Sequence, residues 1–148
     1  MAFVGVSLKN NKEQQELARL INENRRPIIL CTGNAGAGKT FAALAVALQL
    51  QSERRYRHVV YGRNPMPLGE DMGFLPGGLD EKYGPYMGPL YDNLEAIASL
   101  SNENLNPKEL AQRIEMVPIA FLRGRSFRDT ILIIDEAQNL DLTALKAI

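Results

Sequence analysis

A glycine-rich stretch that ends in lysine and threonine offers the clearest chemistry in this sequence. Residues 33–40 read G-N-A-G-A-G-K-T, with Gly33, Gly38, Lys39 and Thr40 at the fixed positions of the G-x-x-x-x-G-K-[ST] pattern. Glycine lets successive backbone N–H groups turn toward a bound anion, the lysine reaches phosphate oxygens, and the hydroxyl can ligate Mg²⁺. The stretch therefore predicts a loop that binds the phosphates of a nucleotide.

Two adjacent acids that follow an apolar run form the second candidate group. Residues 130–136 read T-I-L-I-I-D-E, so Asp135 and Glu136 stand where a strand buried on both faces of a parallel sheet would end. Asp135 suits the acid that holds Mg²⁺ together with Thr40, and Glu136 suits the base that polarises an attacking water. A helix-capping aspartate would explain one of these acids but not both. The two motifs together predict hydrolysis of a nucleotide.

The nucleotide is predicted to be ATP rather than GTP. A GTPase is expected to carry D-x-x-G and N-K-x-D, and neither pattern occurs in the sequence, where N-K-E-Q at residues 11–14 comes nearest. A kinase for small molecules uses an acceptor hydroxyl as its nucleophile, so it needs no water-activating glutamate beside the aspartate. ATP hydrolysis is therefore the reaction that the motifs favour.

The elements around the two motifs predict an α/β fold. An apolar run before the phosphate loop, Pro27–Thr32, predicts a strand, and the alanine-rich run after it, Phe41–Leu50, predicts a buried helix that is apolar nearly all round. Further strands are expected at His58–Arg63 and Ile114–Val117, with Pro118 at the end of the latter or at a sheet edge. Strand, loop and helix in this order are the setting that a phosphate loop requires.

The first helix places two glutamines ahead of the phosphate loop. It is expected to start near Asn10 or Asn11, where Asn10 and Glu13 fit a capping box, so Gln14 and Gln15 lie in its first turns. These side chains can form a solvated helix face. Alternatively, one of them reads adenine, because an amide both donates and accepts on one base edge.

The middle of the chain is rich in glycine and proline. Residues 62–90 hold seven of the 12 glycines and five of the 8 prolines, which breaks any helical or alternating pattern. Phe74, Tyr83 and Tyr86 are unlike a solvated linker, so we expect an ordered insertion loop docked on the domain, with a helix resuming about Pro89. The net negative charge of the segment counts against a plain groove for a phosphate backbone.

The composition is that of a soluble globular protein. The 148 residues are 45% hydrophobic and 23% charged, and lysine plus arginine balance aspartate plus glutamate at 17 each, so no overall basic charge indicates nucleic acid. No apolar run approaches the roughly 20 residues of a membrane span. A single cysteine excludes an intrachain disulfide, and the first residues lack the features of a signal peptide. We expect one partial domain over residues 1–148, cytoplasmic and without a membrane partner.

Beyond these motifs, the chain resembles the PhoH-like family of ATPases, relatives of superfamily 1 helicase motor domains. The resemblance covers nearly the whole chain from the first helix onward. It is carried by R-N-P-M-P-L-G-E-D-M-G-F-L-P-G at 63–77, Y-D-N-L-E at 91–95, V-P-I-A-F-L-R-G-R-S at 117–126 and D-E-A-Q-N at 135–139. It implies a P-loop NTPase fold of the RecA or helicase type, with three αβα layers and a mostly parallel sheet. The similar branch often carries a fused nuclease-like PIN domain, which these residues do not include.

The resemblance also assigns roles to individual residues. Lys39, Glu136 and Gln138 would be catalytic, Gln138 by coupling the Mg²⁺ site to the next motif, and Thr40 and Asp135 would hold the metal. The residues expected to bind ATP are Gly33, Asn34, Ala35, Gly36, Ala37, Gly38, Lys39, Thr40, Phe41 and Gln14, with Gln15 as the alternative to Gln14. Two arginines, Arg123 and Arg125, either approach phosphates of ATP or nucleic acid or form a solvated basic turn.

The family pattern continues past Ile148 with a Gly-Asp-x-x-Gln sensor and further arginines. In the related motor folds the next strand inserts between the phosphate-loop strand and the Asp135 strand, so we expect missing C-terminal strands and a gap in the sheet. The chain is then a fragment of a longer protein, or those two strands pair directly, or another chain fills the gap.

The leading hypothesis is Mg²⁺-dependent binding and hydrolysis of ATP. The resemblance adds a coupling to RNA remodelling or phosphate starvation, with RNA or single-stranded nucleic acid as partner and a ring-type homo-oligomer. The alternative is a nucleotide-binding or assembly module that does not hydrolyse ATP by itself, because the sensor and the arginines are absent.

Overall fold

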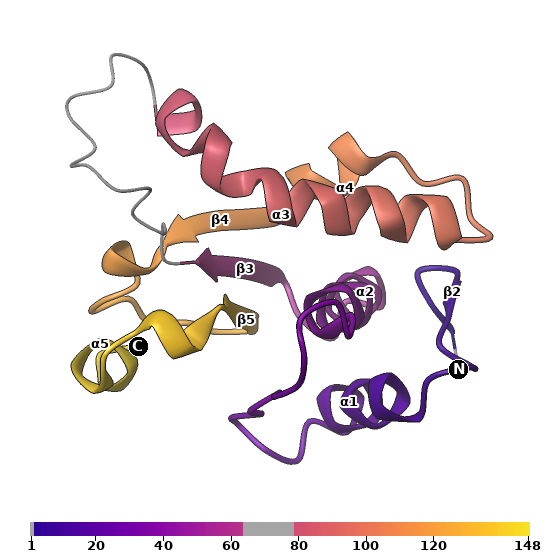
Figure 1. The fold of residues 1–148 in the computed structure, drawn as a ribbon, viewed down its shortest axis with the longest axis horizontal. Helices are drawn as coiled ribbons and strands as arrows, with labels where there is room; N and C mark the ends of the chain where they lie inside the picture. The colour runs from indigo at the N-terminus through magenta and orange to yellow at the C-terminus, as the bar shows by residue number, and fades with distance from the viewer. Residues whose placement is uncertain (1, 64–78) are drawn as a thin grey trace.

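The computed structural model describes residues 2–63 and 79–148, arranged around a small parallel sheet (Figure 1). The elements in chain order are β1 (Ala2–Phe3), β2 (Val6–Ser7), α1 (Lys12–Glu23), α2 (Lys39–Ser52), β3 (His58–Arg63), α3 (Leu79–Leu100), α4 (Pro107–Gln112), β4 (Ile114–Pro118), the 3₁₀ helix η1 (Ile119–Phe121), β5 (Thr130–Asp135), the 3₁₀ helix η2 (Ala137–Asn139) and α5 (Leu142–Lys146). Within the described ranges, no helix is long and apolar enough to cross a membrane.

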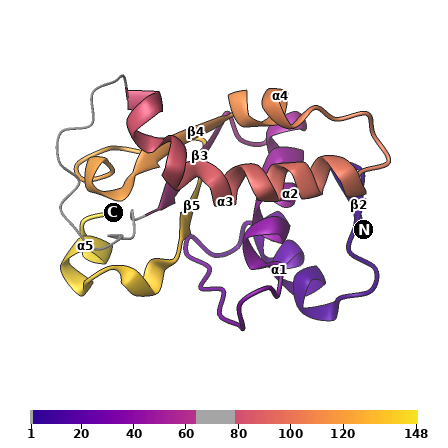
Figure 2. The same cartoon turned by 45° about the horizontal axis from the view of Figure 1, so that its top comes forward.

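The sheet has the strand order β4-β3-β5, and both pairings are parallel. The three strands lie side by side in Figures 1 and 2. Arg63 pairs with Pro118 on one neighbour and with Asp135 on the other, so all three strands end at the same edge. A parallel sheet with helices confirms the predicted α/β class and brings the candidate acids to the edge where such sheets bind ligands.

The two faces of the sheet are covered by different layers. Val59 and Tyr61 belong to the larger core with α1, α2, α3 and α4, whereas the intervening Val60 belongs to a smaller cluster on the opposite face. The smaller cluster consists of Val60, Val117, Ile119 and Leu122, with Phe127, Leu132, Ile134, Leu140 and Ile148 packed against it. The sheet therefore lies between a thick helical layer and a thinner layer formed by η1 and the C-terminal residues.

Helix α2 is buried as its composition predicts. Ala42, Leu50 and every residue of 44–48 are fully shielded from solvent, and the helix contacts α1, α3, β1, β3 and β5. An alanine-rich helix without a polar face can satisfy its surface only in this way. Because the phosphate loop leads directly into α2, the core of the protein fixes where that loop lies.

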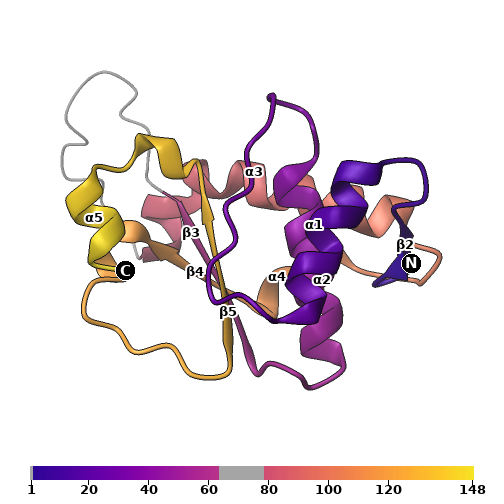
Figure 3. The ribbon, with the colours of Figure 1, turned by 90° about the horizontal axis from the view of Figure 1, so that it is seen from below.

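The strand predicted at Pro27–Thr32 does not form. Figure 3 shows this segment as an irregular trace between α1 and α2, and Ile28 and Leu30 are 83% and 81% exposed. A strand requires a hydrogen-bonded neighbour, and in the described part of the chain β5 pairs only with β3. The prediction that β5 is buried on both faces is wrong for the same reason, because all six of its residues are half-buried. Direct pairing of the two segments is thus contradicted.

The helix predicted to resume about Pro89 begins ten residues earlier, at Leu79. Its packing is carried by Leu90, Leu94 and Ile97, which are fully buried at helical spacing. Proline removes an amide donor and crowds the preceding turn, yet the helix runs through a proline-containing segment that we expected to be a loop. The rest of the predicted insertion, residues 64–78 with Phe74, lies outside the described residues.

The N-terminal region contains a hairpin that the sequence analysis did not predict. Val4 and Gly5 form its turn with positive φ angles of 45° and 74°, and the turn is held by the Gln49 side chain, which accepts from the Val4 amide at 2.8 Å. Helix α1 then starts as expected near Asn11. The capping residue is Asn11 rather than Asn10, since the Asn11 side chain accepts from the Gln14 amide at 3.0 Å.

Arg113 connects the end of α2 to the start of β4. Its guanidinium donates to the Leu48 carbonyl and to Ser52 Oγ, both at 2.7 Å, and to Gln51 Oε1 at 3.1 Å.

We expect Arg113→Met to lower the free energy of unfolding by about 1–3 kcal/mol, because hydrogen bonds from a charged, half-buried donor are lost. The control is Arg57→Met, since the Arg57 side chain is 81% exposed and 3.8 Å from its acid. Equal losses in urea unfolding would contradict this.

The exposed segment before the phosphate loop gives a second stability prediction. Replacing Ile28 and Leu30 together by serine should change the free energy of unfolding by less than about 0.5 kcal/mol, because exposed side chains away from special features contribute little. Leu44→Ala, in the buried part of α2, should cost about 2–5 kcal/mol. Chemical denaturation compares the two. A double serine variant that loses stability as Leu44→Ala does would show that the segment is buried in solution.

Candidate functional site

The phosphate loop is built on two glycines in the left-handed region. Gly36 and Gly38 have φ angles of 77° and 76°, which side chains rarely tolerate. A Cβ at Gly38 would also lie 2.4 Å from Gln14 Nε2, whereas nothing lies within 4 Å of a Cβ placed on Gly36. The backbone conformation therefore favours glycine at position 38, whereas the Gln14 side chain could shift to make room, and the loop surface around Gly36 is open.

The loop leads into an uncapped helix end. Gly38 is the N-cap of α2 and, as a glycine, forms no side-chain cap with the first-turn amides of this helix. Lys39 folds back over the loop, where its ammonium donates to the Gly33 carbonyl at 2.8 Å and to the Asn34 carbonyl at 2.9 Å. Residues 33–36 are exposed. This arrangement places backbone N–H groups and the Lys39 ammonium at an accessible helix N-terminus, the setting in which anions bind.

The structure separates the two candidate glutamines. Gln14 Nε2 donates to the Ala37 carbonyl of the phosphate loop at 3.0 Å, while Gln15 Nε2 donates to the Leu8 carbonyl at 2.7 Å and so secures the end of the hairpin. Only Gln14 therefore reaches the loop. A role of either glutamine in reading adenine stays a prediction.

Thr40 and Asp135 meet although they are 95 residues apart in sequence. Thr40 Oγ1 donates to Asp135 Oδ1 at 2.8 Å, which joins the first turn of α2 to the end of β5. The Asp135 side chain is 16% exposed, so its carboxylate is largely but not completely shielded from water. The two residues predicted to hold a metal are thus placed as a pair of oxygen donors at the mouth of the phosphate loop.

Two residues of β3 complete the surroundings of Asp135, and sequence reasoning missed both. Tyr61 Oη donates to Asp135 Oδ2 at 2.6 Å, and Arg63 Nη1 lies 3.8 Å from the same oxygen. Burial, and then the hydrogen bond to Asp135, raise the pKa of the Tyr61 hydroxyl. Their spacing of two residues at the end of a predicted strand was the available signal, because it places both side chains on one face.

Glu136 and Gln138 follow Asp135 at the same edge of the sheet. Glu136 has φ 53° and ψ 41°, an uncommon conformation for a residue with a side chain, and such strain is frequent at functional sites. Gln138 Nε2 donates to the Glu136 carboxylate. The structure therefore brings together the predicted base and the predicted coupling residue. Phe41, in contrast, packs its ring against the main core, so only its backbone remains for a ligand at the loop.

The predicted arginines do not join this group. Arg125 pairs with Glu115 of β4 at 2.9 Å, and its guanidinium lies 5.2 Å from the centre of the Phe127 ring. It therefore lies at the β4 edge of the sheet, with β3 between it and β5. Arg123 is exposed. Of the two readings left open by the sequence, a basic turn on the surface fits this geometry better than contact with phosphates at the loop.

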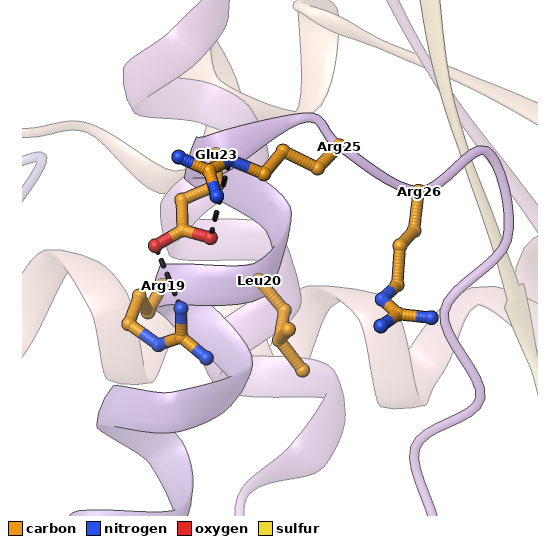
Figure 4. A pocket seen from close by; sticks show the side chains of 5 residues that line it. All are labelled: Arg19, Leu20, Glu23, Arg25 and Arg26. Carbon is orange, nitrogen blue, oxygen red and sulfur yellow. Dashed lines mark hydrogen bonds and ion pairs between the residues drawn. The ribbon is translucent and has the colours of Figure 1, made fainter.

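A separate hollow of about 340 Å³ lies at the C-terminal end of α1 (Figure 4). It is lined by Arg19, Leu20, Glu23, Arg25 and Arg26. Arg19 pairs with Glu23 at 2.7 Å, and Arg25 approaches the same carboxylate at 4.0 Å, so one negative charge is shared between two of the three arginines that line the hollow. None of its residues belongs to the group around Thr40 and Asp135.

The donor atoms at the loop suit a small, hard cation. In the described part of the chain, no three His, Cys, Asp or Glu side chains cluster as metal ligands. Mg²⁺ does not need such a cluster, because it binds through one or two protein oxygens and completes its shell with phosphate oxygens and water. Thr40 Oγ1 and Asp135 Oδ1 are 2.8 Å apart and supply that minimal set.

Comparison with known proteins gives the family of this chain. The family described as PhoH-like protein matches residues 7–148. The chain is 38% identical to protein PhoH2 of Bacillus subtilis over 97% of its own length and 33% of the relative's, and 34% identical to protein PhoH of Escherichia coli K12 over 94% and 39%. A PhoH-like protein of Mycobacterium tuberculosis is 38% identical over 80% of the chain and 33% of the relative. The chain thus spans about a third of the length of these relatives, and it belongs to the PhoH-like protein family.

Proposed function

We propose that this chain binds ATP with Mg²⁺ and hydrolyses it. The observation that supports the proposal most directly is the hydrogen bond between Thr40 and Asp135, which joins the phosphate loop to the acid at the end of β5. A glycine-rich turn that served only the fold would have no need of a carboxylate at the mouth of the loop. Membership of the PhoH-like family and the G-x-x-x-x-G-K-[ST] pattern point in the same direction.

Different residues of the site would bind the phosphates, the metal and the base. The uncapped amides at the start of α2 would donate to phosphate oxygens, and Lys39 would exchange its two loop carbonyls for the β- and γ-phosphates. Thr40 and Asp135 would hold Mg²⁺, which neutralises charge that develops on the phosphates when it is bound. Gln14, which is hydrogen-bonded to the loop, would contact the adenine ring.

Glu136 would act on water rather than on the nucleotide. Its carboxylate follows Asp135 directly and could accept a proton from a water molecule as that water attacks the γ-phosphate. The hydrogen bond from Gln138 holds the Glu136 side chain in place, so Gln138 would orient this base. In this proposal the strained backbone of Glu136 aims the carboxylate, since the αL conformation turns the chain sharply after β5.

A second candidate function is a nucleotide-binding module that does not hydrolyse ATP by itself. One observation favours it: the Arg125 guanidinium is committed to Glu115, and the Arg63 guanidinium lies beside the carboxylate of Asp135. An arginine that stabilises transition-state charge on phosphate is worth roughly 10³–10⁵ in rate. A module that lacks one would bind ATP and release phosphate only slowly.

The proposal extends to the partners that the family resemblance suggests. These are RNA or single-stranded nucleic acid, a ring-type homo-oligomer, and a cytoplasmic role in RNA remodelling or phosphate starvation. They rest on the resemblance alone, since the balanced charge of the chain gives nucleic acid no separate support. Filter binding of a labelled single-stranded RNA at two salt concentrations, and size measurement with and without ATP, test them.

Lys39→Ala tests nucleotide binding. The change removes the cation that would reach the β- and γ-phosphates, so affinity for a fluorescent ATP analogue should fall at least tenfold, which corresponds to about 1.4 kcal/mol. Lys108→Ala, which removes an exposed lysine from α4, is the matched control and should bind as the unmodified chain does. If both variants bind equally well, the phosphate loop is not the nucleotide site.

Glu136→Gln separates hydrolysis from binding. The amide keeps the size of the side chain but cannot accept the proton, so phosphate release should fall by about 10²–10⁴, the usual contribution of general-base catalysis. ATP affinity should stay unchanged. Glu95→Gln, on the exposed side of α3, controls for loss of a surface charge. Equal phosphate release from the unmodified chain and Glu136→Gln would remove Glu136 as the base, whereas binding without release in the unmodified chain would favour the module.

A further inference from the structure

Tyr61 holds the oxygen of Asp135 that Thr40 does not hold. Its hydroxyl donates to Asp135 Oδ2 at 2.6 Å, while Thr40 donates to Oδ1 at 2.8 Å. We propose that Tyr61 is a positioning residue, which fixes the plane of the Asp135 carboxylate so that Oδ1 stays turned toward Thr40 and the metal site. This inference rests on the proposed function, and it adds a residue to that site which the motifs do not contain.

The register of the sheet puts Tyr61 in the right place. Tyr61 pairs with Ile133 and Arg63 pairs with Asp135, so Tyr61 and Asp135 are diagonal neighbours on adjacent strands. Side chains two residues apart point to the same face, and a diagonal pair is within reach of a long aromatic side chain. A tyrosine here can therefore span to the carboxylate without any change in the backbone.

The Tyr61 ring is also rigid. Its exposed fraction is 1%, and it belongs to the main core with α2 and α3. A ring enclosed in this way cannot turn aside without opening the core, which is packed as closely as a crystal. An aspartate side chain, in contrast, has a broad torsion about its last bond. The rigid Tyr61 ring therefore restricts the rotation of the Asp135 carboxylate.

Arg63 cannot replace this hydrogen bond. Its Nη1 lies 3.8 Å from Asp135 Oδ2, which is beyond hydrogen-bond length although close enough for attraction between charges. Tyr61 thus supplies a directional donor to this oxygen. Arg63 supplies positive charge nearby but no hydrogen bond of ordinary length to Asp135 Oδ2.

Removal of the Tyr61 hydroxyl should therefore weaken the binding of metal rather than the binding of the nucleotide. Loss of a partner that orients a metal-binding side chain typically costs 10–100-fold in metal affinity. The loop amides and Lys39 do not depend on Tyr61, so binding of the nucleotide without metal should be preserved. A residue that merely filled the core would instead weaken both kinds of binding together.

The test is Tyr61→Phe, which removes one oxygen atom and keeps the ring. Binding of a fluorescent non-hydrolysable ATP analogue is followed in EDTA and during a Mg²⁺ titration, alongside thermal unfolding. The Mg²⁺ midpoint should rise about 10–100-fold, with the affinity in EDTA unchanged. Tyr56→Phe is the control, because Tyr56 also packs against the core, although it is only half-buried, and it lies just before the start of β3, away from Asp135. It should leave the midpoint where it is.

Several results would overturn the inference. An unchanged Mg²⁺ midpoint would do so, as would equal losses with and without metal, or a Tyr61→Phe chain that no longer folds, since these show no role or a structural one. Arg63→Gln should shift the midpoint less than Tyr61→Phe; a larger shift would assign the orientation of Asp135 to charge. If the unmodified chain binds the analogue without any Mg²⁺ dependence, the proposed function fails and this inference fails with it.

Discussion

The central constraint in this structure is that α2 has no polar face, so neighbouring elements must cover it on all sides. Helices α1 and α3, the hairpin strand β1, and strands β3 and β5 all contact it. Apolar burial of this kind is the main favourable term in folding. Because the glycine-rich loop runs straight into the first turn of α2, the core fixes where the loop begins, and the contacts of Gln14 and Lys39 with loop carbonyls are added to this.

The same constraint assembles the acid end of the site. Once β3 and β5 pack against α2 in parallel, their last residues lie at the edge where α2 begins, and Thr40, Tyr61 and Asp135 become neighbours. Each comes from a different part of the chain, so no local stretch of sequence contains the site. Hydrogen bonds to a charged group contribute about 1.5–3 kcal/mol each, so the carboxylate also helps to hold the three elements together.

The sequence analysis was most accurate where a residue pattern has one physical solution. The apolar runs at His58–Arg63 and Thr130–Asp135 form strands with those bounds, and the alanine-rich run forms a buried helix. It failed at Pro27–Thr32, since an apolar run becomes a strand only beside a partner, and a partner cannot be read from the run itself. The helix that starts at Leu79 was missed because proline and glycine were given more weight than the leucines that anchor it.

The motifs of the candidate site could be predicted from the sequence, but the side-chain contacts between them could not. Asp135 was identified from its place after an apolar run, but its bond to Tyr61 depends on the pairing register of β3 with β5, which a single sequence does not reveal. Gln14 was singled out as a reader of adenine, and its contact with the Ala37 carbonyl depends on how α1 packs against α2. Side-chain contacts between elements depend on the tertiary structure, so they could be identified only once the fold was known.

The folded-back position of Lys39 has a consequence for how tightly this loop can hold an anion. Its ammonium already makes two hydrogen bonds of ordinary length, to the carbonyls of Gly33 and Asn34. An incoming phosphate therefore competes with the protein's own backbone for the same three protons, and the two carbonyls must turn to water when they are released. Phosphate binding therefore replaces the hydrogen bonds of Lys39 to the two carbonyls with hydrogen bonds to the phosphate. The net gain in free energy is the difference between these two sets of interactions. The same Lys39 ammonium that would bind a phosphate therefore also stabilises the conformation of the loop.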